Sequence, residues 1–480
     1  MDYSQLAMDT ALQLGAEYAD IRIQNTHSEV IFIRNLSVKA LNEGELFGYG
    51  IRVFKNGAWG FAHNNIFTSQ AVQDTVKKAM IIALNSAKIN KKHKLHLSPE
   101  RSYKDKFKSP MQIDPFKISV KDKVDSLLEV SRTLLSYAPI KVVRSYVITE
   151  QNEKIFASSS GTYLDLKYTH ITPMYSATAV TEKDTQSRSF NPGGRNAGWE
   201  YMEELDLLGN APRVAEEAIM KVNAETLKEE KRRDLILDPA NLSLTMHESV
   251  GHPTELDRVL GWEADYAGIS FATPEKLGVF QYGSPIVNFL GDNLLPNGLA
   301  TLGYDDDGVP GQKWYIIKDG ILNEYGSTRD TIDFINGQLS RGCNRATYYF
   351  DFPINRIPNL YLEAGKKELS PSQLINDTED GIIIEGQGSF SIDQHRVNFQ
   401  FGGDLFWEIK NGKKTRMLKK VLYKSNNPEF WNSCDAICDQ RYWKSWGVSN
   451  CGKGQPPQTG RMTHGAAPSR FRKIRVGGSQ

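Results

Sequence analysis

The segment His247–His252, with the sequence His-Glu-Ser-Val-Gly-His, carries the side chains best suited to chemistry. It is similar to the H-E-x-x-H zinc motif, in which two histidines one helical turn apart bind the metal and the glutamate acts as a general base. Here the second histidine follows the first by five residues, not four. We therefore predict that His247 and His252 are metal ligands and that Glu248 is the base.

A step of five residues does not suit a regular α-helix, because it turns the two imidazoles about 140° apart. A π-bulge widens one turn and brings residues five apart onto the same face. Gly251 lowers the steric cost of this distortion, and Pro253 disfavours α geometry at His252. The sequence thus predicts a distorted helical turn. The alternative is an ordinary surface helix with an unrelated histidine nearby.

A catalytic zinc ion takes three protein ligands and leaves one position open, so the motif needs a third ligand. One candidate is Cys451, which lies in a glycine-flanked loop where the backbone can approach a ligand closely, and where a nearby cation would hold the thiolate. As an alternative, Cys434, Cys438 and Cys451 form a separate structural zinc site. The acidic candidates follow the motif directly and are Glu255, Asp257, Glu263 and Asp265.

The elements that must position these residues divide the chain into two halves. The first half, residues 1–228, alternates long amphipathic helices with strands that look antiparallel. The Asn-Gly pair at 56–57 predicts a hairpin turn, because both turn residues need positive φ. The charged stretch 228–234 marks the boundary. We expect helices at 6–14, 68–90, 119–135 and 210–228.

The second half, residues 229–480, has one helix bearing the motif and then mainly strands, with a second Asn-Gly hairpin at 411–412. Residues 424–460 are rich in Asn, Ser, Gly and Pro and are predicted to be loop-like. The expected fold class is α+β. An N-terminal α/β domain with long helices and antiparallel strands precedes a mainly β, barrel-like domain that carries the metal-binding helix.

Composition narrows the classes of function. The formal net charge is +1, which gives no electrostatic reason to expect nucleic acid or an anionic membrane as partner. No window of 18 uninterrupted apolar residues predicts a transmembrane helix. Four cysteines in 480 residues do not make a disulfide framework. With no signal-peptide pattern at the first residues, we expect a reducing, cytoplasmic setting.

Over most of its length the sequence resembles the TldD/PmbA family of zinc metallopeptidases, on the TldD, or catalytic, side. Residues 247–255 match the family's His-Glu-x-x-x-His signature, and residues 305–312 are similar to its acidic-Gly-x-Pro stretch. Residues 456–469, which include His464, and the 424–450 segment depart from the family pattern. The other matching segments are 15–20, 50–62, 451–455 and 476–478.

The resemblance implies a ligand set and an activity. It assigns one zinc ion per active chain to His247, His252 and Cys451, with Glu248 activating a zinc-bound water that attacks peptide bonds in unfolded peptides or small proteins. It also implies an active site enclosed within a dimer, either a homodimer or a heterodimer with a PmbA-type subunit.

Substrate contacts are predicted from local pattern. The segment 387–392 looks like a bulged strand whose exposed edge would pair with the main chain of a peptide. We therefore take Ser389, Phe390 and Ser391 as candidate substrate-binding residues, together with His464. Two other functions stay open: a non-catalytic assembly or scaffold subunit, and a zinc hydrolase of a non-peptide amide. PmbA-type subunits lack the His-Glu-x-x-x-His set that this chain has.

Overall fold

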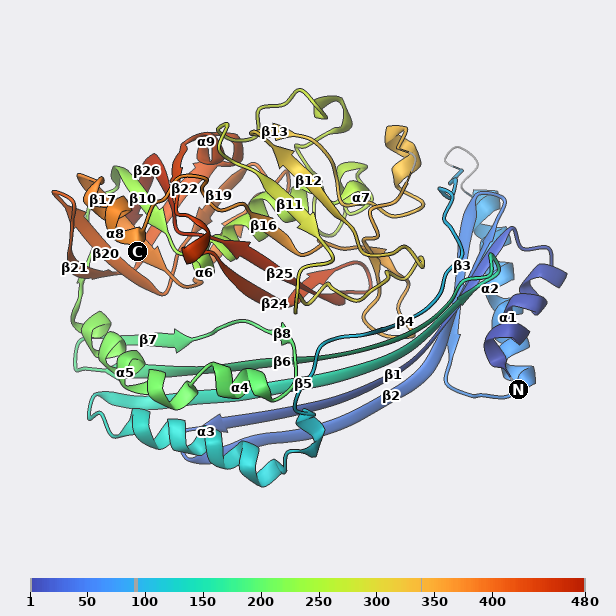
Figure 1. The fold of residues 1–480 in the computed structure, drawn as a ribbon, viewed down its shortest axis with the longest axis horizontal. Helices are drawn as coiled ribbons and strands as arrows, with labels where there is room; N and C mark the ends of the chain where they lie inside the picture. Colours follow the sequence, from blue (N-terminus) through green and yellow to red (C-terminus); the bar gives the residue numbers. More distant parts are fainter. Residues whose placement is uncertain (1, 90–93, 338, 479–480) are drawn as a thin grey trace.

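The computed structural model describes residues 2–89, 94–337 and 339–478. The first half of the chain forms one long, curved, mostly antiparallel sheet beneath the second half (Figure 1). Its strand order is β3-β2-β1-β5-β6-β4, and two further strands also pair with β6. Four strands are long: β1 (Tyr18–Arg34), β2 (Ser37–Lys55), β5 (Ile140–Ser158) and β6 (Tyr163–Val180). The others are β3 (Ala58–Asn64), β4 (Lys104–Lys108), β7 (Thr185–Phe190) and β8 (Arg195–Asn196).

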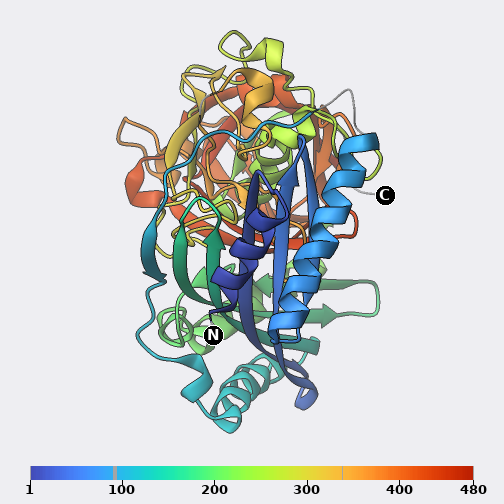
Figure 2. The same ribbon diagram turned by 90° about the vertical axis from the view of Figure 1, so that its right-hand side faces the viewer.

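Helices cover the two ends of this sheet (Figures 1 and 2). At one end Ala19 and Ile21 of β1 pack in a buried cluster with two helices, and at the other end Ile31 and Ile33 of the same strand pack with three more. One long strand therefore serves two separate hydrophobic cores. The helices at the first end are α1 (Tyr3–Gln13) and α2 (Ser69–Ile89), and those at the second are α3 (Val120–Leu135), α4 (Glu200–Glu204) and α5 (Leu207–Asn223).

The other face of the sheet is polar and buried against the second half, because alternate residues of a strand point to opposite faces. Arg52 Nη2 donates to Asp20 Oδ2 at 2.6 Å and, across the contact, to Asp307 Oδ1 at 2.8 Å. Lys154 Nζ donates to Asp306 Oδ1 at 2.7 Å. The acidic stretch that begins at Asp305 thus joins the two halves through buried ion pairs. Breaking one such pair costs about 3–5 kcal/mol.

The second half, together with residues 225–226 of the first half, forms a ten-stranded sheet, a six-stranded sheet and a two-stranded ribbon. The ten-stranded sheet has β9 (Glu225–Thr226), β10 (Lys231–Leu237), β17 (Asp380–Glu385), β18 (Phe390–Ile392), β19 (Asn398–Phe401), β20 (Leu405–Lys410), β21 (Lys413–Lys419), β22 (Val421–Asn426), β23 (Cys434–Ile437) and β26 (Ser469–Gly478). The six-stranded sheet has β11 (Phe289–Asp292), β12 (Lys313–Lys318), β13 (Ile321–Leu322), β16 (Leu360–Leu362), β24 (Lys444–Lys453) and β25 (Gln458–Ala466). The ribbon has β14 (Asn344–Arg345) and β15 (Ile354–Asn355).

The helix α6 (Pro239–Met246) lies between the two larger sheets, in contact with β24 and β25 of one and β17 of the other. The α+β fold class is confirmed, but neither sheet closes on itself, so the expected barrel is replaced by two open sheets. The short helices of this half are α7 (Leu256–Val259), α8 (Pro371–Asn376) and α9 (Asn427–Asn432). None of the described helices is long and apolar enough to cross a membrane.

Local turn chemistry predicted the hairpins correctly. Asn56 and Gly57 both have positive φ, as do Asn411 and Gly412. The loop-like assignment of 424–460 was wrong, because this segment contains α9, β23 and the ten-residue strand β24. Helix α5 begins earlier than expected, at Leu207, because Asp206 caps it. Part of the predicted boundary 228–234 belongs to β10, and the division into domains at 228 stays a prediction.

Candidate metal centre

Helix α6 brings the first histidine to the interior. The Asp238 side chain caps the helix by accepting from Asn241 N at 2.7 Å, and Pro239 occupies the first turn, where its missing N–H costs nothing. The sheets on both sides bury every residue of α6 except Leu244, which is partly buried. His247, directly after Met246, is therefore presented to a closed interior rather than to solvent.

A π-helical turn follows, over His247–Gly251, as the five-residue spacing predicted. The N–H of His252 donates to the carbonyl of His247, which closes the wide turn and brings the two imidazole centroids to 4.7 Å. Gly251 is needed for space as well as flexibility. A Cβ at this position would lie 2.9 Å from Ile357 Cδ1.

The prediction for Pro253 was wrong. His252 has φ −63° and ψ −41°, which is α geometry, although a following proline disfavours it. Pro253 lies instead in a short 3-10 turn formed by His252–Thr254. Thr254 Oγ1 donates to Val250 O at 2.7 Å, which helps to hold the compact end of the distorted helix.

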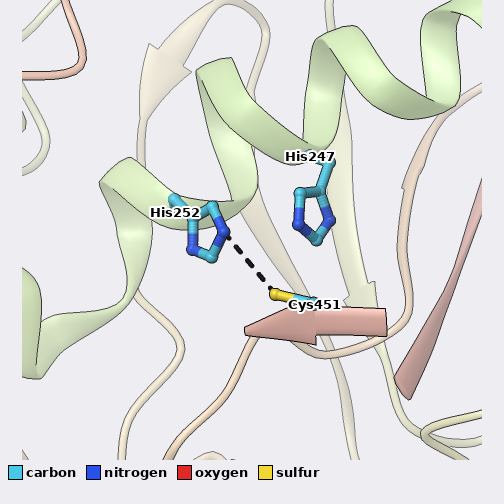
Figure 3. Close-up of side chains that lie close together, drawn as sticks. All are labelled: His247, His252 and Cys451. Atoms are coloured by element: carbon cyan, nitrogen blue, oxygen red, sulfur yellow. Dashed lines mark hydrogen bonds between the residues drawn. The ribbon is translucent and has the colours of Figure 1, made fainter. Parts of the chain in front are cut away.

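Cys451 approaches the two histidines from β24 (Figure 3). Its Sγ lies 3.6 Å from His252 Nε2, and one donor atom from each of His247, His252 and Cys451 lies within 4.8 Å of the others. Ligands of a tetrahedral zinc ion stand about 3.3–3.6 Å apart, given the usual Zn–N and Zn–S lengths. The donor set and its spacing therefore fit a zinc ion.

The β24–β25 ladder is irregular just before the cysteine. The register shifts between Val448 and Cys451, and pairing resumes at Cys451 opposite Gly460. Such an irregularity re-aims side chains near functional sites. Arg356 fills the space over Gly460 and donates through Nη2 to the carbonyl of Cys451, which holds the backbone of the cysteine.

The Cys451 thiol differs electrostatically from the thiols of the other three cysteines. Burial alone would raise its pKa, but the neighbouring His252 and Arg356 outweigh burial and lower the pKa. Burial raises the pKa of Cys343 and of Cys438 to about 12, and that of Cys434 also rises. Cys451 is thus the cysteine predisposed to the thiolate form that binds metals. Cys434 and Cys438 do not join a metal cluster among the described residues.

Glu255 orients a ligand and does not lie in the cluster itself. Its Oε2 accepts from His252 Nδ1 at 2.8 Å, which leaves Nε2 facing the sulfur. Buried Lys453 lies 3.2 Å from Glu255 Oε1 and 2.7 Å from Asp257 Oδ1. Burial raises the pKa of Asp257 to about 6, while Lys453 and His252 outweigh burial and lower that of Glu255. None of the four acidic candidates for third ligand belongs to the described cluster.

His464 orients the other ligand. Its Nε2 lies 2.7 Å from His247 Nδ1, and its Nδ1 lies 3.2 Å from the Leu360 carbonyl, which only accepts. His464 Nδ1 is therefore the donor, its Nε2 accepts from His247, and His247 Nε2 keeps a lone pair. Because its ring is fully buried with both nitrogens engaged, His464 is not placed to contact a substrate as the sequence suggested.

Ser389, Phe390 and Ser391 lie elsewhere, on the edge of the ten-stranded sheet. Ser389 directly precedes β18, which holds the other two and pairs only with β19, and all three residues are exposed. The structure does not bring them into the His-His-Cys cluster. The turn that follows β18, however, reaches back to the candidate base.

Glu248 is held by a residue that the sequence did not indicate. Arg396, in the turn between β18 and β19, donates through Nη1 to Glu248 Oε2 at 2.6 Å. The only sequence signal for it is a basic residue in a predicted strand-turn-strand segment, which is common at any surface. A contact between residues 148 positions apart cannot be predicted from the local sequence pattern.

A cavity of about 940 Å³ lies between the first half and the start of β24. Its lining includes Trp446, Gly447 and Thr463, the last directly before His464. The strand that carries Cys451 at one end thus borders an open space at its other end.

Comparison with known families identifies the class of this chain. The PmbA/TldA metallopeptidase C-terminal domain matches residues 230–478, its domain 1 matches residues 19–83, and its central domain matches residues 113–224. The first match alone covers more than half of the chain, and it contains both histidines and Cys451. This chain belongs to the PmbA/TldD family.

Relatives and solved structures agree with this assignment. The chain is 26% identical over 467 residues to a metalloprotease of Methanothermobacter thermautotrophicus, covering 96% of each, and 24% identical over 482 residues to the zinc metalloprotease TldD homolog of Saccharolobus solfataricus, covering 98% of each. Its fold matches TldE from Thermococcus kodakarensis with a TM-score of 0.75 at 15% identity, covering 98% of this chain and all of the other.

Proposed function

We propose that this chain is a zinc-dependent metallopeptidase that cleaves unfolded peptides or small proteins. The observation that carries the proposal is the buried cluster of His247, His252 and Cys451 beside Glu248. Two nitrogens and a thiol predisposed to ionise are a donor set for zinc, and three ligands leave a coordination position for a reactant. Names of relatives as metalloproteases add support.

Different residues of the candidate site have different roles in hydrolysis. Zinc, when bound, supplies a Lewis acid and lowers the pKa of a water molecule. Glu248 accepts the proton of the attacking water and passes it to the leaving amine. Glu255 and His464 hold His252 and His247 with the Nε2 atoms free. Glu248 lies next to a ligand in the chain, so base and nucleophile meet without a large movement.

Substrate binding along β18 follows from its position at a sheet edge. A peptide that pairs with the main chain of Phe390–Ile392 would be bound largely independently of its sequence. Protection of the amides of 387–401 from exchange when a peptide binds is the expected result. Unchanged exchange in that segment would contradict it.

A dimer is the proposed assembly, either of two copies or with a PmbA-type partner. Among the described residues, the part of β2 before Tyr49 pairs only with β1, and it exposes several apolar side chains, which supports an interface there. These are Val38 (43% exposed), Leu41 (50%), Leu46 (40%) and Phe47 (50%). Native mass spectrometry of wild type and Leu41→Asp should show the dimer weakened by the variant. The free thiols of all four cysteines fit the proposed cytoplasmic setting.

The decisive experiment measures metal content and peptide digestion on the same samples. Wild type should hold one zinc ion per chain and digest a peptide library, and Cys451→Ala should lose both properties. Cys438→Ala, which removes a buried thiol outside the cluster, is the matched control and should keep both. Glu248→Gln should keep zinc and lose turnover.

The alternatives give different results in this experiment. Zinc binding without digestion of any peptide favours a hydrolase of a non-peptide amide. Absence of zinc from wild type purified with ample metal favours a scaffold subunit. Normal digestion by Glu248→Gln would remove Glu248 from the role of base.

A further inference from the structure

The carboxylate of Glu248 is held at one oxygen and free at the other. Arg396 Nη1 donates to Oε2 at 2.6 Å, and no described residue donates a hydrogen bond to Oε1. The residue is only 6% exposed, so its carboxylate cannot rely on bulk water for orientation. The arginine therefore determines which oxygen remains for a reactant.

Arg396 is itself held in an unfavourable backbone conformation. Its φ is +60°, in the left-handed region, which costs an ordinary L-residue about 1–2 kcal/mol and costs glycine nothing. Such strain persists where the surroundings impose it, and it is concentrated at functional sites. A large cation at this position indicates that the side chain, not the turn, is required.

The turn that carries Arg396 is fixed in place. The Asp393 carboxylate accepts from Val397 N at 2.8 Å and from Asn398 N at 2.9 Å. The backbone of residues 269–271 donates two hydrogen bonds to the turn, at 2.8 and 3.1 Å. A turn bound this way does not swing freely. The contact with Glu248 is thus a permanent support and not a latch.

The second terminal nitrogen of Arg396 links Glu248 to a candidate metal ligand through hydrogen bonds. Its Nη2 donates to the Ala267 carbonyl at 3.2 Å, which also accepts from Arg258 Nη1 at 2.6 Å. Arg258 Nε lies 3.4 Å from Glu255 Oε2, the atom that orients His252. Glu248 and His252 are therefore positioned from one shared carbonyl.

We propose that Arg396 is a positioning residue for Glu248, whose guanidinium fixes Oε2 so that Oε1 is directed at the reacting water. This inference rests on the proposed function. A general base must lie within hydrogen-bond reach of its proton, and a displacement of about 1 Å costs roughly 10²-fold in rate. The planar fork of arginine holds a carboxylate more rigidly than a lysine ammonium does.

The test removes the guanidinium without straining the backbone. Arg396→Gly suits the positive φ, so the fold should be kept, and zinc content should equal that of wild type. On a peptide that wild type cleaves, kcat should fall about 100-fold while KM changes less than about threefold. Lys420→Gly is the matched control: it removes an exposed cation with φ +56° far from the site and should leave kcat unchanged.

Three further experiments separate positioning from general structure. Millimolar guanidinium should restore part of the kcat of Arg396→Gly. The kcat of Arg396→Lys should lie between that of wild type and that of Arg396→Gly. In a crystal structure of zinc-loaded Arg396→Gly, the Glu248 carboxylate should leave the position it has beside Arg396 in wild type.

Each contrary result overturns the inference. Three results with Arg396→Gly would contradict it: an unchanged kcat, a loss of zinc, or a Glu248 carboxylate that stays in its wild-type position. If wild type cleaves no peptide, the proposed function fails, while the crystallographic comparison still decides the role of Arg396.

Discussion

His464 Nε2 and His247 Nδ1 lie 2.7 Å apart, so one imidazole holds another. Burial and the neighbouring His247 hold the pKa of His464 well below its usual range, and the ring stays neutral. The other ligand, His252, is held instead by a carboxylate, Glu255. The two imidazoles of the candidate zinc site are thus supported by partners of different charge.

Removal of His464 should weaken metal binding. His464→Ala deletes the acceptor that fixes the tautomer of His247, and loss of such a partner typically lowers metal affinity 10–100-fold. His464→Gln, whose amide reaches about as far as Nε2, should lose less. Competition with a zinc chelator measures the affinities. The control is His170→Ala, another buried histidine, and an equal effect there would contradict the specific role of His464.

The π-helical turn should not accept a methyl group. In Gly251→Ala the new Cβ would lie 2.9 Å from Ile357 Cδ1, which should cost about 1–3 kcal/mol of unfolding free energy and weaken zinc binding. Shortening the neighbour, in Gly251→Ala with Ile357→Val, should recover part of both losses. Gly452→Ala, where a Cβ meets nothing within 4 Å, is the control in thermal denaturation. Equal melting temperatures for both alanine variants would refute this argument.

Lys453 should be important for stability. It is fully buried and pairs with Glu255 and Asp257. Lys453→Met leaves buried Asp257 without this cation and leaves Glu255 with Arg258 alone, which should cost about 3–5 kcal/mol in urea denaturation. Lys444→Met, on the exposed part of the same strand, should cost little. Addition of Asp257→Asn to Lys453→Met should restore part of the loss, and failure to do so would argue against charge as the cause.

Asp238 should make stability depend on pH. Burial outweighs its hydrogen bonds from Asn241 N and Gly386 N and raises its pKa from 3.8 to about 6. The folded state then binds the proton more tightly than the unfolded state, so this contribution is present at low pH and is lost as pH rises from about 4 to about 6. Asp238→Asn keeps the helix cap and removes the titration.

The melting temperature of Asp238→Asn should therefore improve relative to wild type across that interval. The difference between the two proteins cancels the other carboxylates, which titrate in both. A difference that stays constant from pH 4 to pH 7 would show that Asp238 does not titrate there.

Local chemistry in the sequence predicted the features that depend on neighbours in the chain. The spacing of His247 and His252, with Gly251 between them, correctly predicted a widened turn, and Asn56-Gly57 correctly predicted a hairpin. Ser119 was correctly expected at the start of a helix, where its side chain accepts from Asp122 N. Each of these depends on contacts within about five residues.

Long-range contacts could not be predicted this way. The loop-like composition near Cys451 concealed β24, because that strand is stabilised by pairing with β25 and packing on α6, not by its own propensity. Arg396 was overlooked, since a basic residue in a turn is ordinary until its partner is known. His464 was predicted to contact the substrate, because nothing in the local sequence indicated that another imidazole faces it.

The order of the chain has a consequence for biosynthesis. His247 and Glu248 emerge from the ribosome 204 and 203 residues before Cys451, and β26, which lies between β22 and β10, follows Cys451 in the chain. A nascent polypeptide therefore carries both imidazoles and the carboxylate without the sulfur, and its larger sheet stays split until β26 has been synthesised. On the proposed function, the hydrolytic site is complete only after Cys451 has been synthesised, so a shorter nascent chain is not able to cut itself or its neighbours.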